Sequence, residues 1–197
     1  MKTTTKLFAI VAVFATVLFA SCKKEETSKP SVKPIETLIK TKMEFSSYDI
    51  DDFTRTMAIV FKSSKAGKIT HLGAKLEPGT YNVALLDSSS RSVLSTTTVT
   101  ISDTSNYAYT KISDIAIVAN KFYYVTVNNA TTSNTLNKKY FSYNLLVDNF
   151  PQTDGNFTYL EPEFLLNTTD ATKIIDDGSY LQNNGITGVP SFIFEEN

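Results

Sequence analysis

Hydrophobic and polar residues alternate in short runs from about residue 35 to the end of the chain, and turn residues separate these runs every 8 to 15 positions. A period of two residues is typical of β-strands. The run TMAIVFK (56–62) is apolar at successive positions, so we expect a strand that is buried on both faces at the centre of a sheet. The Thr-rich run SVLSTTTVTI is expected to place Val93, Val99 and Ile101 on one face.

Further runs with the same pattern are ITHLGAKL (69–76), YNVALLD (81–87), NYAYTKI (106–112), KFYYVTV (121–127), YFSYNLLV (140–147) and PSFIFE (190–195), the expected closing strand. The segment IETLIKTKM has Ile35, Leu38 and Ile39 at helical spacing, while TKMEF could equally begin a strand, and both alternatives stay open. The pattern predicts an all-β fold for residues 35–197. We expect one antiparallel β-sandwich domain, of the jelly-roll or immunoglobulin-like kind, with few or no helices.

Residues 1–21 have the pattern of an export signal peptide. Lys2 and Lys6 supply its positive start, and LFAIVAVFATVLFA supplies 14 nearly uninterrupted apolar residues. At ~1.5 Å per residue this run is too short to span a hydrocarbon core of ~30 Å. Ala20 and Ser21 are the small residues that a signal peptidase needs near its cleavage point.

The stretch LFASC ends in Cys22, the single cysteine of the chain, and resembles the lipobox of bacterial lipoproteins. The resemblance implies that Cys22 becomes the first mature residue and carries a diacylglycerol thioether and an N-acyl chain. Two or more acyl chains anchor a protein stably where one does not. Phe19 departs from the commonest residue at its position. The alternatives are a free core cysteine or a plain secretory signal cut nearby.

Residues 22–34, CKKEETSKPSVKP, are charged and contain two prolines, so we expect a flexible tether between the membrane and the domain. The cluster Lys23-Lys24-Glu25-Glu26 resembles the surface-export signal of lipoproteins in the Bacteroidota. This resemblance implies an outer-membrane location that faces outward. A tether that only solubilises the chain, with the domain facing the periplasm, is the alternative.

Three segments, FKSSKAGKITHLGAKL, GTYNVALLDSSSRSVLSTTTVTI and IVANKFYYVTV, follow one another in an order that resembles an uncharacterised β-sandwich family. The family is common in secreted bacterial proteins, some of them multidomain carbohydrate-active ones. The likeness covers about residues 55–129 and returns at PSFIFE. Leu86 stands where the family often has Trp, Asn120 replaces a usual Gly, and the final strand lacks the family's aspartate. The resemblance implies a β-sandwich and transfers no catalytic residues.

The formal charge of −1 falls to −3 without Lys2 and Lys6 of the leader, which leaves 17 basic against 20 acidic residues. This balance gives no electrostatic reason to expect a nucleic acid partner. One cysteine cannot form a disulfide framework.

Catalytic groups are scarce in the sequence. His71 is the only histidine, and it lies in mid-strand beside apolar residues, so we interpret it as a structural or surface imidazole. A zinc site built from His and Cys is excluded by their number. Glu161 and Glu163 would share a strand face and could in principle form the acid pair of a glycosidase, while Asp51 and Asp52 would point to opposite faces. Because solvated edge carboxylates are commoner, we expect no catalysis.

Two acidic clusters are candidates for a structural calcium ion, which binds carboxylate and carbonyl oxygens. Asp49 and Asp51 belong to the first cluster, and Asp176 and Asp177 to the second. Neither has the full spacing of a known calcium loop, and solvated turn acids are the alternative. We expect no other cofactor.

Tyrosines at a spacing of two are the candidate ligand-binding residues, because aromatic rings stack on sugar rings. Tyr107 and Tyr109 share one predicted strand face, and Tyr143 shares another with Phe141. Tyr124 lies next to Tyr123 on a strand, so one of the two should point outward. The absence of Trp weakens this interpretation, and core packing is the alternative.

Three functions are compatible with these observations. The first is a lipid-anchored module of the cell envelope that binds a glycan or another extracellular ligand through loops and exposed tyrosines. The second is a structural or adhesive envelope subunit that acts through sheet edges. The third is a hydrolase, which ranks last because the chain lacks a recognisable set of catalytic groups.

Overall fold

A computed structural model describes residues 30–51, 53–130, 138–146, 149–173, 180–181 and 184–197, and for residues 47–51, 138–140 and 180 it describes the backbone alone. The elements in chain order are β1 (Ser31–Val32), α2 (Pro34–Lys42), β2 (Met43–Asp51), β3 (Arg55–Ser63), β4 (Gly67–Lys75), β5 (Gly79–Asp87), β6 (Val93–Ile101), β7 (Ala108–Ile117), β8 (Phe122–Asn128), β9 (Lys138–Leu145), β10 (Gln152–Asp154), β11 (Phe157–Tyr159), β12 (Glu163–Leu166), β13 (Tyr180–Leu181), β14 (Gly185–Thr187) and β15 (Val189–Glu196).

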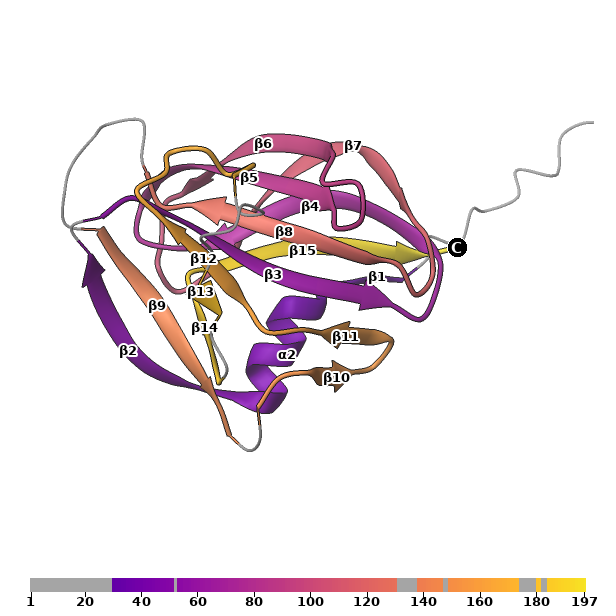
Figure 1. Ribbon diagram of the computed structural model, residues 1–197, viewed down its shortest axis with the longest axis horizontal. Helices are drawn as coiled ribbons and strands as arrows, with labels where there is room; N and C mark the ends of the chain where they lie inside the picture. The colour runs from indigo at the N-terminus through magenta and orange to yellow at the C-terminus, as the bar shows by residue number, and fades with distance from the viewer. Residues whose placement is uncertain (1–29, 52, 131–137, 147–148, 174–179, 182–183) are drawn as a thin grey trace, which may run out of the picture.

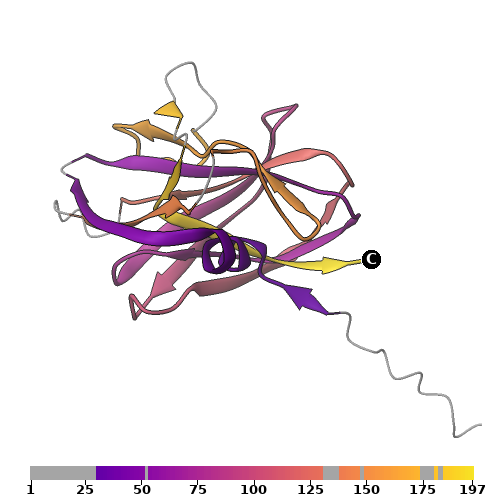
Figure 2. The ribbon, with the colours of Figure 1, turned by 90° about the horizontal axis from the view of Figure 1, so that it is seen from below.

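The strands form antiparallel sheets, which confirms the predicted all-β sandwich (Figure 1). A four-stranded sheet has the order β1-β15-β4-β7, and an eight-stranded sheet has the order β10-β11-β3-β8-β5-β6, with β12 and β13 continuing beside β3. These two sheets stack on each other, and a three-stranded sheet, β14-β9-β2, extends to one side (Figure 2). In the described residues β2 pairs with β9 alone, so its second edge is open.

The core lies between the two stacked sheets. β3 is buried at every position from Met57 to Phe61, as the apolar run predicted, because β8 flanks it on one edge and β11 and β12 on the other. The ring of Phe61 stacks on Phe192 of β15, with ring centroids 4.3 Å apart, and this contact joins the two sheets. Burial of such large aromatic side chains is the main favourable contribution to folding.

The segment that left helix and strand open contains both, in succession. Pro34 occupies the first turn of α2, where its missing N–H is tolerated. Ile35, Leu38 and Ile39 form the buried stripe that packs towards β15, and Met43 then turns extended and begins β2.

The ordered fold starts earlier than the expected domain boundary at residue 35. Ser31 and Val32, which we assigned to the tether, pair with Glu195 and Phe194 of β15. Cys22 and the rest of residues 1–29 lie outside the described residues, so the leader and the lipid anchor stay predictions. In the part of the chain that the structure describes, no helix is long and apolar enough to cross a membrane.

One position of the Thr-rich strand is wrongly predicted. Val99 and Ile101 are buried, but Val93 is 47% exposed. The cause is a register shift against β5, where Leu85 pairs with Ser95 and Leu86 with Val93. A bulge of this kind reverses the alternation of faces, which a strict period of two cannot anticipate.

Candidate functional site

Two of the four predicted tyrosines line one groove beside α2. We call it the tyrosine groove: a depression of about 830 Å³ whose lining includes Lys33, Glu36, Lys75, Asn106, Tyr107 and Tyr143. Its rim is completed by β1, which pairs with the end of β15. The groove is therefore lined by the start of the described chain and by residues from three later segments, at Lys75, at Ser105 to Tyr107 and at Tyr143.

Tyr109, the third predicted tyrosine, packs directly against this groove. Its ring stacks on that of Tyr107, with centroids 6.4 Å apart, as the shared strand face predicted. Tyr109 pairs across the sheet with Gly73 of β4. A Cβ atom at Gly73 would lie 2.4 Å from the Tyr109 ring, so the glycine makes room for this ring.

The Tyr109 hydroxyl links β7 to α2 and to β15. It donates a hydrogen bond to Glu36 Oε1 at 2.5 Å and shares a second with Ser191 Oγ of β15 at 2.9 Å. Glu36 also pairs with Lys33 at 3.2 Å. Burial, and next the bond to the Glu36 carboxylate, raises the pKa of Tyr109 well above its usual range. Glu36 is thus held by two partners within the protein.

The Lys75 ammonium lies among three aromatic rings. Its Nζ is 5.6 Å from the ring centroid of Tyr107, 5.2 Å from that of Phe141 and 5.8 Å from that of Tyr143. These distances fall in the range of cation–π attraction. No carboxylate of the described residues forms an ion pair with Lys75.

The Tyr107 hydroxyl is buried and has no hydrogen-bond partner among the described residues. Burial raises the pKa of Tyr107 well above its usual range, so the phenol is neutral at physiological pH. Leaving a buried hydroxyl unpaired costs about 1–3 kcal/mol. Because its oxygen is shielded from solvent, this cost lies within the folded protein, and the hydroxyl is not exposed to a ligand in the groove.

Tyr124 belongs to a different place. It lines a cavity of about 270 Å³, which we call the Glu163 cavity, together with Val60, Phe150, Leu160, Glu161 and Glu163. The Tyr124 hydroxyl donates a hydrogen bond to Glu163 Oε1 at 3.3 Å. The four predicted tyrosines are thus not one site.

The two glutamates of this cavity come together as their spacing predicted. Glu161 and Glu163 both contribute to its wall. Burial raises the pKa of Glu163, although the bond from Tyr124 lowers it again in part. A carboxyl group that keeps its proton more readily can act as a general acid.

The other predicted site residues carry no described site. The Asp49 and Asp51 backbones lie in β2, while their side chains and all of Asp176 and Asp177 lie outside what the structure describes. The described residues contain no cluster of three or more His, Cys, Asp or Glu side chains that could hold a metal ion. His71 is half-buried on β4, and its Nδ1 lies 2.9 Å from Thr70 Oγ1.

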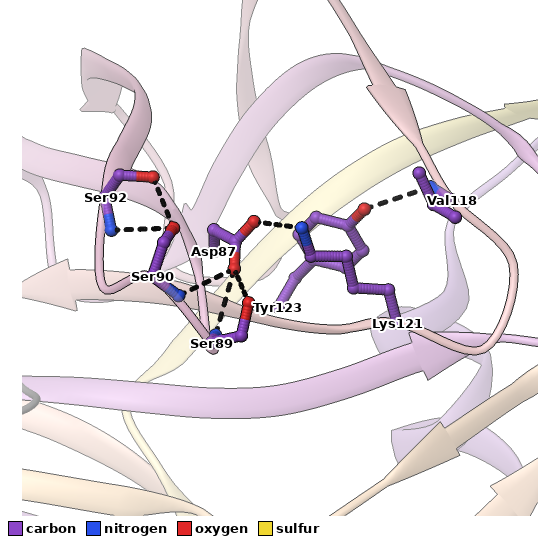
Figure 3. A network of polar contacts seen from close by, with 7 residues as sticks. All are labelled: Asp87, Ser89, Ser90, Ser92, Val118, Lys121 and Tyr123. Atoms are coloured by element: carbon purple, nitrogen blue, oxygen red, sulfur yellow. Dashed lines mark hydrogen bonds and ion pairs between the residues drawn. The ribbon is translucent and has the colours of Figure 1, made fainter.

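The carboxylate of Asp87 supports a turn, and both of its oxygens have partners (Figure 3). Its Oδ1 accepts hydrogen bonds from the Ser89 and Ser90 amides and the Ser89 hydroxyl, and Oδ2 pairs with Lys121. The bond to Lys121, followed by those from the serines, lowers the pKa of Asp87 below its usual range. We assign this network to stability.

Sequence reasoning missed Lys75 and Glu36 as groove residues. Lys75 was visible only as the polar last residue of a strand face, and Glu36 only as an acid in an ambiguous segment. No local pattern indicates that these side chains meet.

A scan against protein-family models finds no match for this chain, and a search of curated proteins finds no significant match. The resemblances to bacterial lipoproteins and to a secreted β-sandwich family therefore stay predictions.

Proposed function

We propose that the mature protein is a lipid-anchored module of the bacterial outer membrane that faces outward and binds an extracellular glycan in the tyrosine groove, without catalysis. The observation that carries this proposal is the convergence of Tyr107, Tyr143, Lys75 and Asn106 at one groove of about 830 Å³. Ammonium and amide donors gathered at a groove of this size can hydrogen-bond the hydroxyl groups of a sugar.

The predicted anchor is consistent with this role. The groove residue Ser31 lies nine positions after Cys22, and an extended chain spans at most ~3.3–3.6 Å per residue. With Cys22 acylated, the groove would lie within roughly 30 Å of the bilayer surface. Its ligand would then be a component of the envelope or a polymer that reaches the cell surface.

A glycan array tests the proposal. The probe is the soluble mature chain, residues 22–197 with Cys22→Ser, applied to plant, host and bacterial glycans. We expect binding that Lys75→Met weakens. The matched control is Lys62→Met, because Lys62 also covers an aromatic ring, that of Phe122 at 5.0 Å, outside the groove. Silence across all three glycan classes would refute glycan binding.

The anchor has its own test. Cys22→Ser should abolish metabolic labelling of the full chain with a fatty-acid analogue, while labelling of other lipoproteins in the same cells continues. Labelling that persists in the variant would show that Cys22 is not the acylated residue.

The open edge of β2 favours a structural or adhesive subunit as an alternative. β2 is nine residues long, with alternate residues directing their N–H and C=O groups to that edge, and Phe45 on this strand is 48% exposed. Under this alternative, the soluble chain should self-associate in sedimentation at micromolar concentration, and Phe45→Lys should weaken the association. A monomer at all concentrations tested would remove self-association through this edge.

The Glu163 cavity is the observation that favours a hydrolase, the candidate we rank last. Glu161 and Glu163 line one cavity, and two carboxyl groups are what glycosidases use. The test is release of reducing ends from glycans bound on the array. Release that Glu163→Gln abolishes would support catalysis, and bound glycans that stay intact would count against it.

A further inference from the structure

The aromatic rings of the tyrosine groove are not open stacking surfaces. Tyr143 is only 8% exposed, which corrects the expectation of exposed tyrosines. The Lys75 ammonium covers the rings of Tyr107 and Tyr143, and Lys33 lies 4.8 Å from the ring centroid of Tyr109. A sugar face could reach these rings only by displacing the ammonium groups.

The rings hold the ammonium groups in place instead. Three rings around Lys75 restrict its long side chain, which otherwise loses substantial rotamer freedom when a ligand binds. Ring faces attract the positive charge but take up few of the three N–H donors of an ammonium group. Lys75 is thus positioned in advance and keeps donors for a ligand.

The lining of the groove carries more positive than negative charge. It contains three lysines, Lys33, Lys40 and Lys75, against one acid, Glu36. Glu36 is already bound by Lys33 and by the Tyr109 hydroxyl. Within the described residues, Lys40 and Lys75 form no ion pair with a carboxylate. Asp103, which accepts a hydrogen bond from Asn106 of the lining, interacts with Lys75 electrostatically without forming an ion pair. The groove therefore keeps an excess of positive charge that an anionic ligand could balance.

We infer that the tyrosine groove binds the carboxylate or phosphate of an acidic saccharide, with the Lys75 ammonium as the group that meets the anion. The inference rests on the proposed glycan-binding function and names its ligand class. A charge-assisted hydrogen bond is roughly twice as strong as a neutral one, so the anion dominates recognition.

The test uses pairs of ligands in which the acidic group is present in one member and esterified or absent in the other. Calorimetric titration of the soluble mature chain (Cys22→Ser) would compare trigalacturonic acid with its methyl ester, and glucose 6-phosphate with glucose. We expect at least one acidic member to bind about tenfold or more tightly than its neutral partner, and to weaken as salt rises from 50 to 300 mM. Inorganic phosphate and galacturonate polymers then separate a simple anion site from one that needs the sugar.

The variants locate the effect. Lys75→Met should abolish the preference for the acid, Lys75→Arg should restore it in part, and Lys62→Met should leave it within about twofold. Equal binding of acid and ester would overturn the inference while leaving glycan binding intact. Binding of no saccharide, here and on the array, would overturn both. A preference that survives Lys75→Met would overturn the role of Lys75, provided circular dichroism shows the variant folded.

Discussion

Replacing Asp87 tests whether a buried carboxylate stabilises the turn between β5 and β6. Asp87 is 6% exposed, and its Oδ1 accepts three hydrogen bonds, at 2.9 Å from the Ser89 amide, 2.7 Å from the Ser89 hydroxyl and 3.1 Å from the Ser90 amide. Its Oδ2 pairs with Lys121, which lies in the connection between β7 and β8, directly before β8 (Figure 3). Asp87→Ala removes all four contacts, whereas Asp87→Asn keeps an oxygen acceptor and loses the charge.

The expected magnitude follows from the number and setting of these contacts. Hydrogen bonds to a charged group contribute about 1.5–3 kcal/mol when their partners are left unsatisfied. The serines are largely exposed, so water replaces much of what they lose. We therefore expect Asp87→Ala to lower the free energy of unfolding by about 2–3 kcal/mol in all, and Asp87→Asn by about 1 kcal/mol. For a domain of this size, 1 kcal/mol corresponds to a change in Tm of about 2–4 °C.

The pH dependence supplies the sign of the charge effect. The pKa of Asp87 is lowered in the folded state, chiefly by Lys121. The contribution is therefore fully present above the unfolded pKa of ~3.9 and is lost as the pH falls through the lower folded value. Urea unfolding at pH 7 and at pH 3 should show a smaller difference between wild type and Asp87→Asn at the acidic pH.

The control is Asp114→Asn, which breaks an ion pair to Lys68 on the exposed surface. Exposed pairs contribute little, so this variant should unfold nearly as the wild type does. Asp87→Ala combined with Lys121→Met should destabilise by less than the sum of the single changes, since both act on one pair. If Asp87→Ala melts like Asp114→Asn, the assigned role of the network is wrong.

Three further changes test other parts of the structure. Tyr159→Phe should raise the free energy of unfolding by about 1 kcal/mol in urea titration, because the fully buried hydroxyl of Tyr159 has no partner among the described residues. An unchanged or lower free energy would contradict this. Burial raises the pKa of Glu163, so the stability that this carboxyl group contributes declines as the pH rises above its unfolded pKa of ~4.3. In thermal melts, the Tm of Glu163→Gln should therefore rise relative to that of the wild type between pH 4 and pH 8. A constant difference in Tm would refute the burial argument. Gly73→Ala should destabilise by about 1–3 kcal/mol in urea titration, because the new Cβ meets the Tyr109 ring at 2.4 Å and the Ala108 carbonyl at 2.5 Å, and normal stability would show that the ring has room to move.

The fold was largely predictable because its main signal is local. Alternation over five to nine residues identifies a strand without reference to its partners, and the apolar run of β3 identified the central position of that strand. The errors arose where pairing with another strand determines which residues belong to the fold and which face they occupy. Val93 changed face through a bulge against β5, and Ser31 joined the fold through pairing with β15, which lies more than 150 residues away in sequence.

The candidate site was predictable in its parts but not in its assembly. The period of two correctly paired Tyr107 with Tyr109, and it brought Glu161 and Glu163 to one cavity. The meeting of Lys75 with the ring of Tyr107, just before β7, and with that of Tyr143 on β9 depends on strand order across separate sheets. Sequence spacing does not contain that information, so a lysine between three rings could not be foreseen.

The net charge of the chain gives the groove chemistry a further consequence. The predicted mature chain carries a formal charge of −3, so its overall field does not attract polyanions. Affinity for an anion must then come from Lys75, fixed by its rings, and from the local excess of lysine in the groove. Binding that depends on one positioned charge requires the sugar that carries the anion to fit the groove. We therefore expect duplex DNA to compete poorly with an acidic saccharide in the same titration, because its phosphates are abundant but cannot enter a groove shaped by α2 and Tyr143. Effective competition by DNA would show that charge alone determines binding.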